Sequence, residues 1–358
     1  MSELKFKVFD YTVMLPQQKQ LFAESFPEVF EQKPEAERNY ERGYKWQYRS
    51  YPAAKNSYEY MASIADEMVG YYAALPYVYK IGGSTFTSGM VCGVMTSPHH
   101  RKAGIFSRLG NYAAQEQKES GVDFNLTFPI RKAVMPGFMR MGWQVGFEMP
   151  LYIRFLKSDS LLRSKKIPLI APLVNIGLKV YNSVLKKKDR RNIMIEAFDQ
   201  FADIRNYGEF ISAYEQTVPN TLRKDIDFST WRYGAPEAEY IFLCAYRDQH
   251  LIGFVSLRSI VREGVPSFGI VDFMVTDENC INTLHNAVNE TAKRHKKEAV
   301  MTMMSKYSAG KYRMLSNGYL KSPFKFHFIF KNLSGKIPQD QLLNERNWHL
   351  MFVDTDDL

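Results

Sequence analysis

The sequence contains few cysteines and no uninterrupted apolar run. Its three cysteines, Cys92, Cys244 and Cys280, lie far apart and form no Cys-x-x-Cys pair. This spacing excludes a disulfide framework and the common zinc motifs, so we expect reduced, structural thiols and no metal. The most apolar stretch, 167–184, is interrupted by a proline, an asparagine and a lysine, and we do not expect it to span a bilayer.

Signal-peptide features are also missing. The first residues lack a charged start, an apolar run and a small-residue cleavage site, so the expected location is cytoplasmic. A length of 358 residues with 45% hydrophobic content favours two domains, because single cores stop growing near about 250 residues. The net charge of +9 favours anionic partners. No nucleic-acid recognition motif accompanies it, so we expect no specific nucleic-acid partner.

The most informative stretch is an apolar strand followed directly by a basic turn and an amphipathic helix. The strand is predicted over 90–96, and the turn after it contains Arg101, Lys102 and Gly104. Unpaired backbone N–H groups at a helix start, together with the helix dipole, bind anions. The pattern therefore predicts a cradle for a diphosphate.

The core Arg101-x-x-Gly104-x-Phe106 resembles the signature of the GCN5-related N-acetyltransferases (GNAT), Arg/Gln-x-x-Gly-x-Gly/Ala, with Phe106 in place of the usual small residue. Residues 66–70 resemble the polar turn and strand that precede this site in the family. Gly142-Trp143 resembles the Gly-Phe pair after the family's last helix. The likeness covers residues 5–157. It implies acetyl-CoA as acyl donor and direct attack of an acceptor amine on the thioester.

The resemblance also implies which residues bind the coenzyme. The end of the strand would pair with the pantetheine arm, the turn would hold the diphosphate, a serine hydroxyl would add a phosphate contact, and the following strand, 123–129, would splay to leave an acyl slot. The cofactor-binding residues predicted in this way are Val94, Met95, Thr96, Arg101, Lys102, Ala103, Gly104, Ile105, Phe106, Ser107 and Asn125.

Catalytic residues stay unassigned. Counting back from Gly142 places Phe138 where many members of the family have a proton-donating tyrosine. No general base stands out, and the candidates by proximity are Asp123, Glu148, His99 and His100. We expect the two histidines, which lie on the turn, to be solvated loop residues. His349 either reaches the site from the tail or caps the second domain.

The order of several motifs repeats along the chain. Trp46-x-Tyr48, a proline and a hairpin in the first half are echoed by Trp231-x-Tyr233, a proline and a hairpin in the second. These aromatic residues either pack in the core or stack on a sugar. After the strand 268–275 the second half has neither the glycine nor the arginine of the first turn.

We therefore predict an α+β fold of tandem GNAT-like domains. Each would have a mixed, mostly antiparallel sheet flanked by helices, and the second would lack the coenzyme-binding turn. The predicted boundaries are 1–157 for the first domain, 158–191 for a basic amphipathic linker, 192–333 for the degenerate domain and 334–358 for an acidic tail. The tail resembles the ending of two-domain acetyltransferases from bacterial surface-polysaccharide pathways.

The linker contains a predicted helix over 174–188, in which Val174, Leu178, Tyr181 and Leu185 recur at helical spacing. We expect this helix to pack on one domain. The alternative is peripheral contact of 165–191 with an anionic membrane.

Three functions follow from these observations. The first is an acyl-CoA-dependent N-acyltransferase for a small amine, such as an amino sugar or nucleotide sugar. The second is a transferase that takes aminoacyl groups from tRNA, and the third is a degenerate, non-catalytic GNAT binding module. We favour the first, and the oligomeric state stays open.

Overall fold

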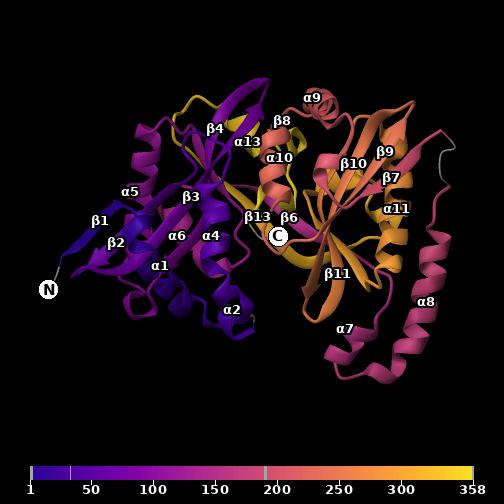
Figure 1. The fold of residues 1–358 in the computed structure, drawn as a ribbon, viewed down its shortest axis with the longest axis horizontal. Helices are drawn as coiled ribbons and strands as arrows, with labels where there is room; N and C mark the ends of the chain where they lie inside the picture. Colours follow the sequence, from indigo (N-terminus) through magenta and orange to yellow (C-terminus); the bar gives the residue numbers. More distant parts are fainter. Residues whose placement is uncertain (1–2, 33, 189–191, 357–358) are drawn as a thin grey trace. The chain divides into compact units, whose positions relative to one another are not determined.

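The computed structural model describes residues 3–32, 34–188 and 192–356. The chain divides into two units, and each unit contains two separate segments. Unit 1 consists of Met1–Gly146 and His327–Leu343, and unit 2 consists of Phe147–Phe326 and Asn344–Leu358. Both units have a mixed sheet with flanking helices, as predicted (Figure 1).

Unit 1 is built on a six-stranded order, β1-β2-β3-β4-β5-β13, in which β4 and β5 run parallel and the other neighbours run antiparallel. Its strands are β1 (Leu4–Val8), β2 (Tyr58–Ile64), β3 (Glu67–Ile81), β4 (Ser84–Thr96), β5 (Phe124–Thr127) and the second half of β13 (Leu320–Asn332). Its helices are α1 (Tyr11–Ser25), α2 (Pro27–Gln32), α3 (Pro34–Arg38), α4 (Tyr40–Arg49), α5 (Ile105–Glu119), α6 (Met135–Arg140) and α13 (Gln339–Leu343).

Side chains of β2 and β3 alternate between two faces, as the period of a strand requires. Tyr60 and Tyr72 belong to an apolar cluster with Leu109 of α5, which packs along these strands (Figure 1). The opposite face carries Tyr71, whose hydroxyl donates to the buried Glu59 carboxylate at 2.6 Å. Glu59 also accepts from Arg49 of α4 at 2.6 Å. Helices therefore cover both faces of this sheet.

The last strand of unit 1 comes from the far end of the chain. Ile329 of β13 pairs with Thr127 of β5, and Ile329 and Leu333 belong to the apolar cluster beneath α5. The boundaries predicted at 157/158 and 333/334 therefore differ from the observed division. The reason is that β6 (Gln144–Phe155) passes from unit 1 into unit 2, while β13 passes from unit 2 into unit 1.

Unit 2 contains the strand order β6-β12-β11-β10-β9-β7, and β8 also pairs in parallel with β14. Its other strands are β7 (Met194–Phe198), β8 (Asn220–Leu222), β9 (Tyr240–Arg247), β10 (His250–Arg262), β11 (Val265–Val275), β12 (Ala299–Met303) and β14 (Trp348–His349). Its helices are α7 (Asp159–Ser164), α8 (Ala171–Val184), α9 (Tyr207–Thr217), α10 (Ile226–Tyr233), α11 (Ile281–Arg294) and α12 (Lys306–Lys311).

Within unit 2, β9, β10 and β11 form an antiparallel meander, and β12 joins β11 in parallel after α11. Gly253 of β10 lies beneath α11, where an added Cβ would come within 2.8 Å of Leu284 Cδ1. The predicted linker folds as α7 and α8 of this unit. The structure places the linker helix three residues earlier at its start than the predicted 174–188.

All three cysteines are buried thiols outside any disulfide. Burial raises the pKa of the Cys280 thiol to about 12 and raises that of Cys244 even further. Both thiols are therefore protonated near neutral pH and unreactive, which agrees with the structural role expected for them.

Candidate functional site

The candidate site is the turn between β4 and α5 in unit 1. A single 3-10 turn, Pro98–His100, follows β4, and Lys102 and Gly104 then adopt positive φ values of 70° and 72°. Gly104 occupies the N-cap of α5, and among the described residues no side chain caps this helix. The first N–H groups of α5 have no intrahelical partner, so they are available to an anion.

Cations surround this helix start. A cavity of about 220 Å³ is lined by Arg101, Lys102 and Arg140, together with residues 104–107. Thr96 and His100 complete its wall. Arg140 lies at the end of α6, and sequence reasoning missed it because only the packing of α6 on α5 brings it to the turn. Three exposed cations beside free N–H groups suit a diphosphate.

Phe106 departs from the small residue expected at its position, and the structure accommodates its ring away from the backbone of the turn. The ring lies over Gly137 of α6, where an added Cβ would be 2.4 Å from Phe106 Cε1. It meets Phe138 edge-on with ring centroids 5.1 Å apart. Phe138 is buried in the same cluster beside Trp143, and it has no group that can donate a proton.

The end of β4 is irregular in a way that opens the strand. Tyr71 pairs with Met95 and Ala73 with Cys92, so Gly93 and Val94 lie opposite the single residue Tyr72. This β-bulge requires φ of +57° at Gly93. An added Cβ at Gly93 would be 2.7 Å from the Tyr48 hydroxyl, which therefore lies beside the bulge.

β4 and β5 pair over a short stretch in the middle of β4. Their ladder covers Ser88 to Met90 on β4, and Thr127 Oγ1 then donates to the Val91 carbonyl at 2.9 Å. Beyond this point the register gives no pair between these two strands, as the prediction of splayed strands requires. Val94, Met95 and Thr96, predicted to contact the pantetheine arm, lie on this last part of β4.

Two predicted residues of β5 lie away from the turn. The Asn125 side chain is buried and donates to Gln117 of α5 at 2.6 Å, so it faces the interior and not a ligand. Asp123 lies beside Thr87, whose N–H donates to the Asp123 carboxylate at 3.2 Å. Thr87 and Thr96 are separated along the strand by about 30 Å. Asp123 is therefore too distant to act as a base at the turn.

Two further catalytic candidates belong to unit 2. Glu148 pairs with Lys325 on neighbouring strands of that unit. His349 is 2% exposed, and its Nε2 lies 3.0 Å from the Asp272 carboxylate. Lys224 Nζ lies 2.8 Å from the other oxygen of Asp272. Burial, followed by repulsion from Lys224, lowers the pKa of His349 to about 4, so this histidine is neutral and enclosed. His349 thus forms part of the core of unit 2, in agreement with the alternative that it caps the second domain.

Unit 2 has its own strand–turn–helix segment between β11 and α11. Asp277 occupies this turn and accepts a hydrogen bond from the Asn279 N–H at 2.8 Å. It also pairs with Arg247. The turn therefore presents a carboxylate of its own where the turn of unit 1 presents free N–H groups and cations.

The part of the chain that the structure describes has cavities elsewhere too. One, of about 290 Å³ in unit 1, is lined by Tyr11, Lys45, Trp46, Arg49 and Ser50. Trp46 is half-buried at this cavity. The other three members of the predicted aromatic set, Tyr48, Trp231 and Tyr233, are buried.

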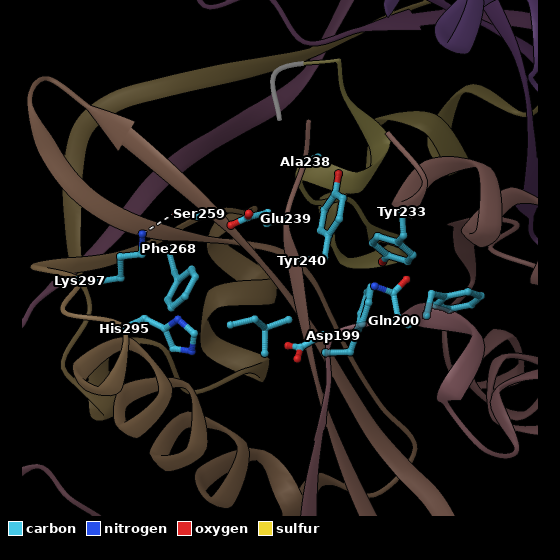
Figure 2. A pocket seen from close by; sticks show the side chains of 13 residues that line it. Asp199, Gln200, Tyr233, Ala238, Glu239, Tyr240, Ser259, Phe268, His295 and Lys297 are labelled. Carbon is cyan, nitrogen blue, oxygen red and sulfur yellow. Dashed lines mark hydrogen bonds between the residues drawn. The ribbon is translucent and has the colours of Figure 1, made fainter. Parts of the chain in front are cut away.

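The larger cavity, of about 430 Å³, lies in unit 2 (Figure 2). Its wall carries the carboxylates of Asp199 and Glu239, the rings of Tyr240 and Phe268, and Lys297. α11 ends beside this cavity and begins beside the Asp277 turn, so the cavity and the turn lie at opposite ends of one helix. No motif in the sequence pointed to it, because its residues come from separate strands and loops.

Comparison with known proteins identifies the domain that contains the turn. Residues 14–146 match the model of the acetyltransferase (GNAT) domain. The chain carries a GNAT domain. This match covers the turn, the β4 bulge and α5, and it extends over most of unit 1. No curated protein sequence matches the chain.

Solved structures similar to this chain include further GNAT proteins. A GCN5-related N-acetyltransferase from Anabaena variabilis is 11% identical with a TM-score of 0.65, covering 92% of this chain and 73% of that one. A tandem GNAT protein from the clavulanic acid biosynthesis pathway is 13% identical with a TM-score of 0.61, covering 94% of this chain and 100% of that one. N-myristoyltransferase of Saccharomyces cerevisiae with bound myristoyl-CoA is 10% identical with a TM-score of 0.63, covering 93% and 81%. At these identities the likeness concerns the fold.

Proposed function

We propose that this protein is an acyl-CoA-dependent N-acyltransferase, with acetyl-CoA as donor and the amine of a small molecule as acceptor. The observation that carries this proposal is the uncapped start of α5, where free N–H groups meet Arg101, Lys102 and Arg140. A diphosphate bound there would continue into a pantetheine arm beside the end of β4. The match of residues 14–146 to a GNAT domain supports the same donor.

The chain's own residues have defined tasks in this reaction. The acceptor nitrogen attacks the thioester carbonyl, a C–N bond forms, the C–S bond breaks, and the thiolate takes up a proton while the nitrogen loses one. Because Phe138 cannot donate that proton, we assign the donation to Tyr48, whose hydroxyl lies beside the bulge at Gly93. Backbone N–H groups exposed by the bulge would polarise the thioester carbonyl.

The proposed acceptor is an amino sugar or nucleotide sugar of a surface-polysaccharide pathway. The cavity beside Trp46 supports this choice because an indole ring stacks on sugar and base rings. We further propose that unit 2 is a second GNAT-like domain that binds no coenzyme. The carboxylate of Asp277 in its turn supports this, since it occupies the Asn279 N–H that a diphosphate would use. The buried cysteines, which form no disulfide, support a cytoplasmic location.

Calorimetric titration with acetyl-CoA tests the proposal directly. We expect one site per chain, and we expect the double substitution Arg101→Glu/Arg140→Glu to weaken binding by at least about 100-fold, because each charged hydrogen bond to phosphate is worth about 1.5–3 kcal/mol. Lys118→Glu/Arg223→Glu makes the same change in net charge at two other exposed sites and is the matched control. Equal affinity of the two double variants would contradict the site.

Turnover separates an enzyme from a binding module. Release of the coenzyme thiol in the presence of a panel of amino sugars and nucleotide sugars is the measurement. Tyr48→Phe should leave the affinity for acetyl-CoA unchanged and lower the turnover number about 10-fold or more, since general acid catalysis typically contributes 100-fold or more. Coenzyme binding without turnover of any amine would instead support the degenerate module.

A further inference from the structure

α8 of unit 2 and the turn before it expose more large apolar side chains than any other segment of the described chain. Seven apolar side chains here are between 47% and 94% exposed. They are Ile167, Leu169, Ile170, Leu173, Ile176, Val180 and Val184. We call these residues the apolar ridge. Isolated exposed apolar residues are ordinary, but a contiguous set of this kind indicates a binding surface for a protein, a membrane or a ligand.

The ridge forms a single stripe. Leu173, Ile176, Val180 and Val184 recur every three or four residues, so they lie on one face of α8. Leu169, at 94% exposure, extends this face by one step into the preceding turn. In a surface helix of a soluble domain such a stripe normally faces the core. In α8 it faces away.

Polar contacts fix this unusual orientation. Asn175 Oδ1 accepts from the Ser158 N–H at 2.8 Å, and its Nδ2 donates to Asp159 at 2.9 Å. Two turns further along the same face, Asn182 Oδ1 accepts from Arg154 Nε at 2.7 Å, and its Nδ2 donates to the Phe155 carbonyl. The polar face of α8 is therefore anchored to unit 2, and the helix cannot turn its ridge inward without breaking these bonds.

The charge around the ridge is of one sign. Between residues 160 and 188 the sequence contains no Asp or Glu, whereas its basic residues are Arg163, Lys165, Lys166, Lys179, Lys186, Lys187 and Lys188. Lys165, Lys166 and Lys179 are exposed, and Lys186 lies 3.7 Å from Glu290. This belt would repel the same surface of a second copy of the chain, and it complements an anionic partner.

We propose that the apolar ridge and its lysines bind the surface of an anionic lipid bilayer, with α8 lying in the plane of the interface. Apolar side chains would enter the boundary between headgroups and acyl chains while the lysines meet lipid phosphates. None of the helices in the part of the chain that the structure describes is long and apolar enough to cross a membrane, so the contact is with one surface. Figure 1 shows α7 and α8 at the margin of unit 2.

Vesicle sedimentation with the full-length protein tests this proposal. The probes are vesicles of phosphatidylcholine alone and of phosphatidylcholine with about one third phosphatidylglycerol. We expect binding to the anionic vesicles to be at least about tenfold stronger and to weaken with salt. Leu169→Gln/Leu173→Gln/Val180→Gln should reduce binding at least about tenfold, because it removes apolar area from the interface. Lys165→Gln/Lys166→Gln/Lys179→Gln should reduce the preference for anionic vesicles.

The matched control is Val13→Gln/Val261→Gln/Leu315→Gln, which changes side chains of similar exposure elsewhere. This control should bind vesicles as the unmodified protein does, and all variants should unfold at unchanged temperature because the altered side chains are exposed. Absence of binding to anionic vesicles, or equal loss in the control, would overturn the proposal. Self-association that the Leu169, Leu173 and Val180 substitutions abolish, without vesicle binding, would overturn it in favour of a protein interface. None of these outcomes depends on coenzyme binding or turnover.

Discussion

His285 illustrates how single residues of unit 2 are committed to packing and excluded from chemistry. Its Nε2 lies 2.9 Å from the Tyr312 carbonyl, and its ring lies against Phe273 and Tyr319. Burial lowers the pKa of His285 to about 4, from an ordinary value near 6.5. His349 has the same low pKa for the same main reason. Both histidines are therefore neutral in the folded protein and charged in the unfolded chain at mildly acidic pH.

The sign of the resulting pH dependence follows from these values. The folded state binds fewer protons than the unfolded state, so the stabilisation is complete above about pH 6.5 and is lost as the pH falls toward 4. Each histidine should lower the free energy of unfolding by about 2 kcal/mol between pH 7 and pH 5.

Substitution by glutamine isolates the contribution of one histidine. His285→Gln retains an N–H donor but cannot titrate, so urea unfolding should show a shallower pH dependence than the unmodified protein. His250→Gln, at an exposed position, should leave the slope unchanged. An identical slope for the His285 variant would contradict the assigned burial and charge state.

The sequence predicted the residues of the candidate site where neighbouring residues along the chain form it. The position of Arg101, Lys102 and Gly104 in a turn before a helix was predictable, because an apolar strand, a basic turn with glycine and an amphipathic pattern follow one another directly. Arg140 was not predictable, because its approach to the turn depends on how α6 packs on α5. Asp123 was misplaced for the related reason that nearness in sequence does not reveal the end of the strand at which a residue lies.

The β4 strand is the element whose irregularity matters most for the proposed chemistry. Its first half pairs on both sides, with β3 and with β5, whereas its second half departs from β5 and carries the bulge at Gly93. A regular strand would have continued the ladder and closed the space beside it. The bulge thus determines where backbone groups are available to a bound ligand.

Gly93→Ala tests the importance of this geometry. The new methyl group would require φ of +57° in a residue with a Cβ and would approach the Tyr48 hydroxyl to 2.7 Å. We expect the free energy of unfolding to fall by about 1–3 kcal/mol and coenzyme affinity to fall with it.

Gly43→Ala is a suitable comparison, because Gly43 lies inside α4 and an added Cβ meets nothing within 4 Å. That substitution should raise the free energy of unfolding by about 0.5–1 kcal/mol, as alanine does in helix interiors. Thermal and urea unfolding of both variants are the measurements. Gain of stability in the Gly93 variant would show that the bulge is not required.

Element types were predictable where periodicity was strong. The order of strand, turn and helix around 90–119 and the linker helix were both expected, and both are present. The face that α8 turns inward was expected, because Val174, Leu178 and Leu185 are half-buried, but the exposed apolar stripe on its other face was not. Its orientation is determined by Asn175 and Asn182, whose partners lie in other elements.

At the scale of the whole molecule, the chain runs from unit 1 into unit 2, returns to unit 1 for residues 327–343, and ends in unit 2. Unit 1 contains all of β1 to β5 but takes the strand beside β5 from residues 327–332. No local sequence pattern predicts this return of the chain to unit 1, because β6 and β13 are both rich in apolar and aromatic residues. Composition therefore favours a division of the sequence at residue 157, yet this division separates unit 1 from part of its own core.

A fragment of residues 1–157 should consequently fail to fold cooperatively. It lacks Ile329 and Leu333 from the cluster beneath α5 and leaves β5 with an exposed edge. Loss of each buried aliphatic side chain costs about 2–5 kcal/mol, so the two losses together are comparable with the free energy of unfolding of a typical domain. Circular dichroism and urea unfolding of the fragment are the measurements.

The complementary fragment joins residues 1–146 to 327–343 through a flexible linker of about six residues. Gly146 and Phe328 are adjacent, since an added Cβ on Gly146 would lie 2.5 Å from the Phe328 ring, so a short linker suffices. This fragment should unfold cooperatively. Cooperative unfolding of 1–157 with equal stability would contradict the role of β13.

The return of the chain to unit 1 also has a consequence for biosynthesis. A ribosome releases the β1 to β5 segment long before it translates residues 327–333, so the sheet around the coenzyme turn stays incomplete during most of elongation. The nascent chain must keep the β5 edge from pairing with another chain for that interval, which at typical rates lasts about 10–40 seconds. A chain terminated anywhere before β13 would thus lack the last strand of unit 1. Such a chain would have no activity, and chaperones and proteases would act on it.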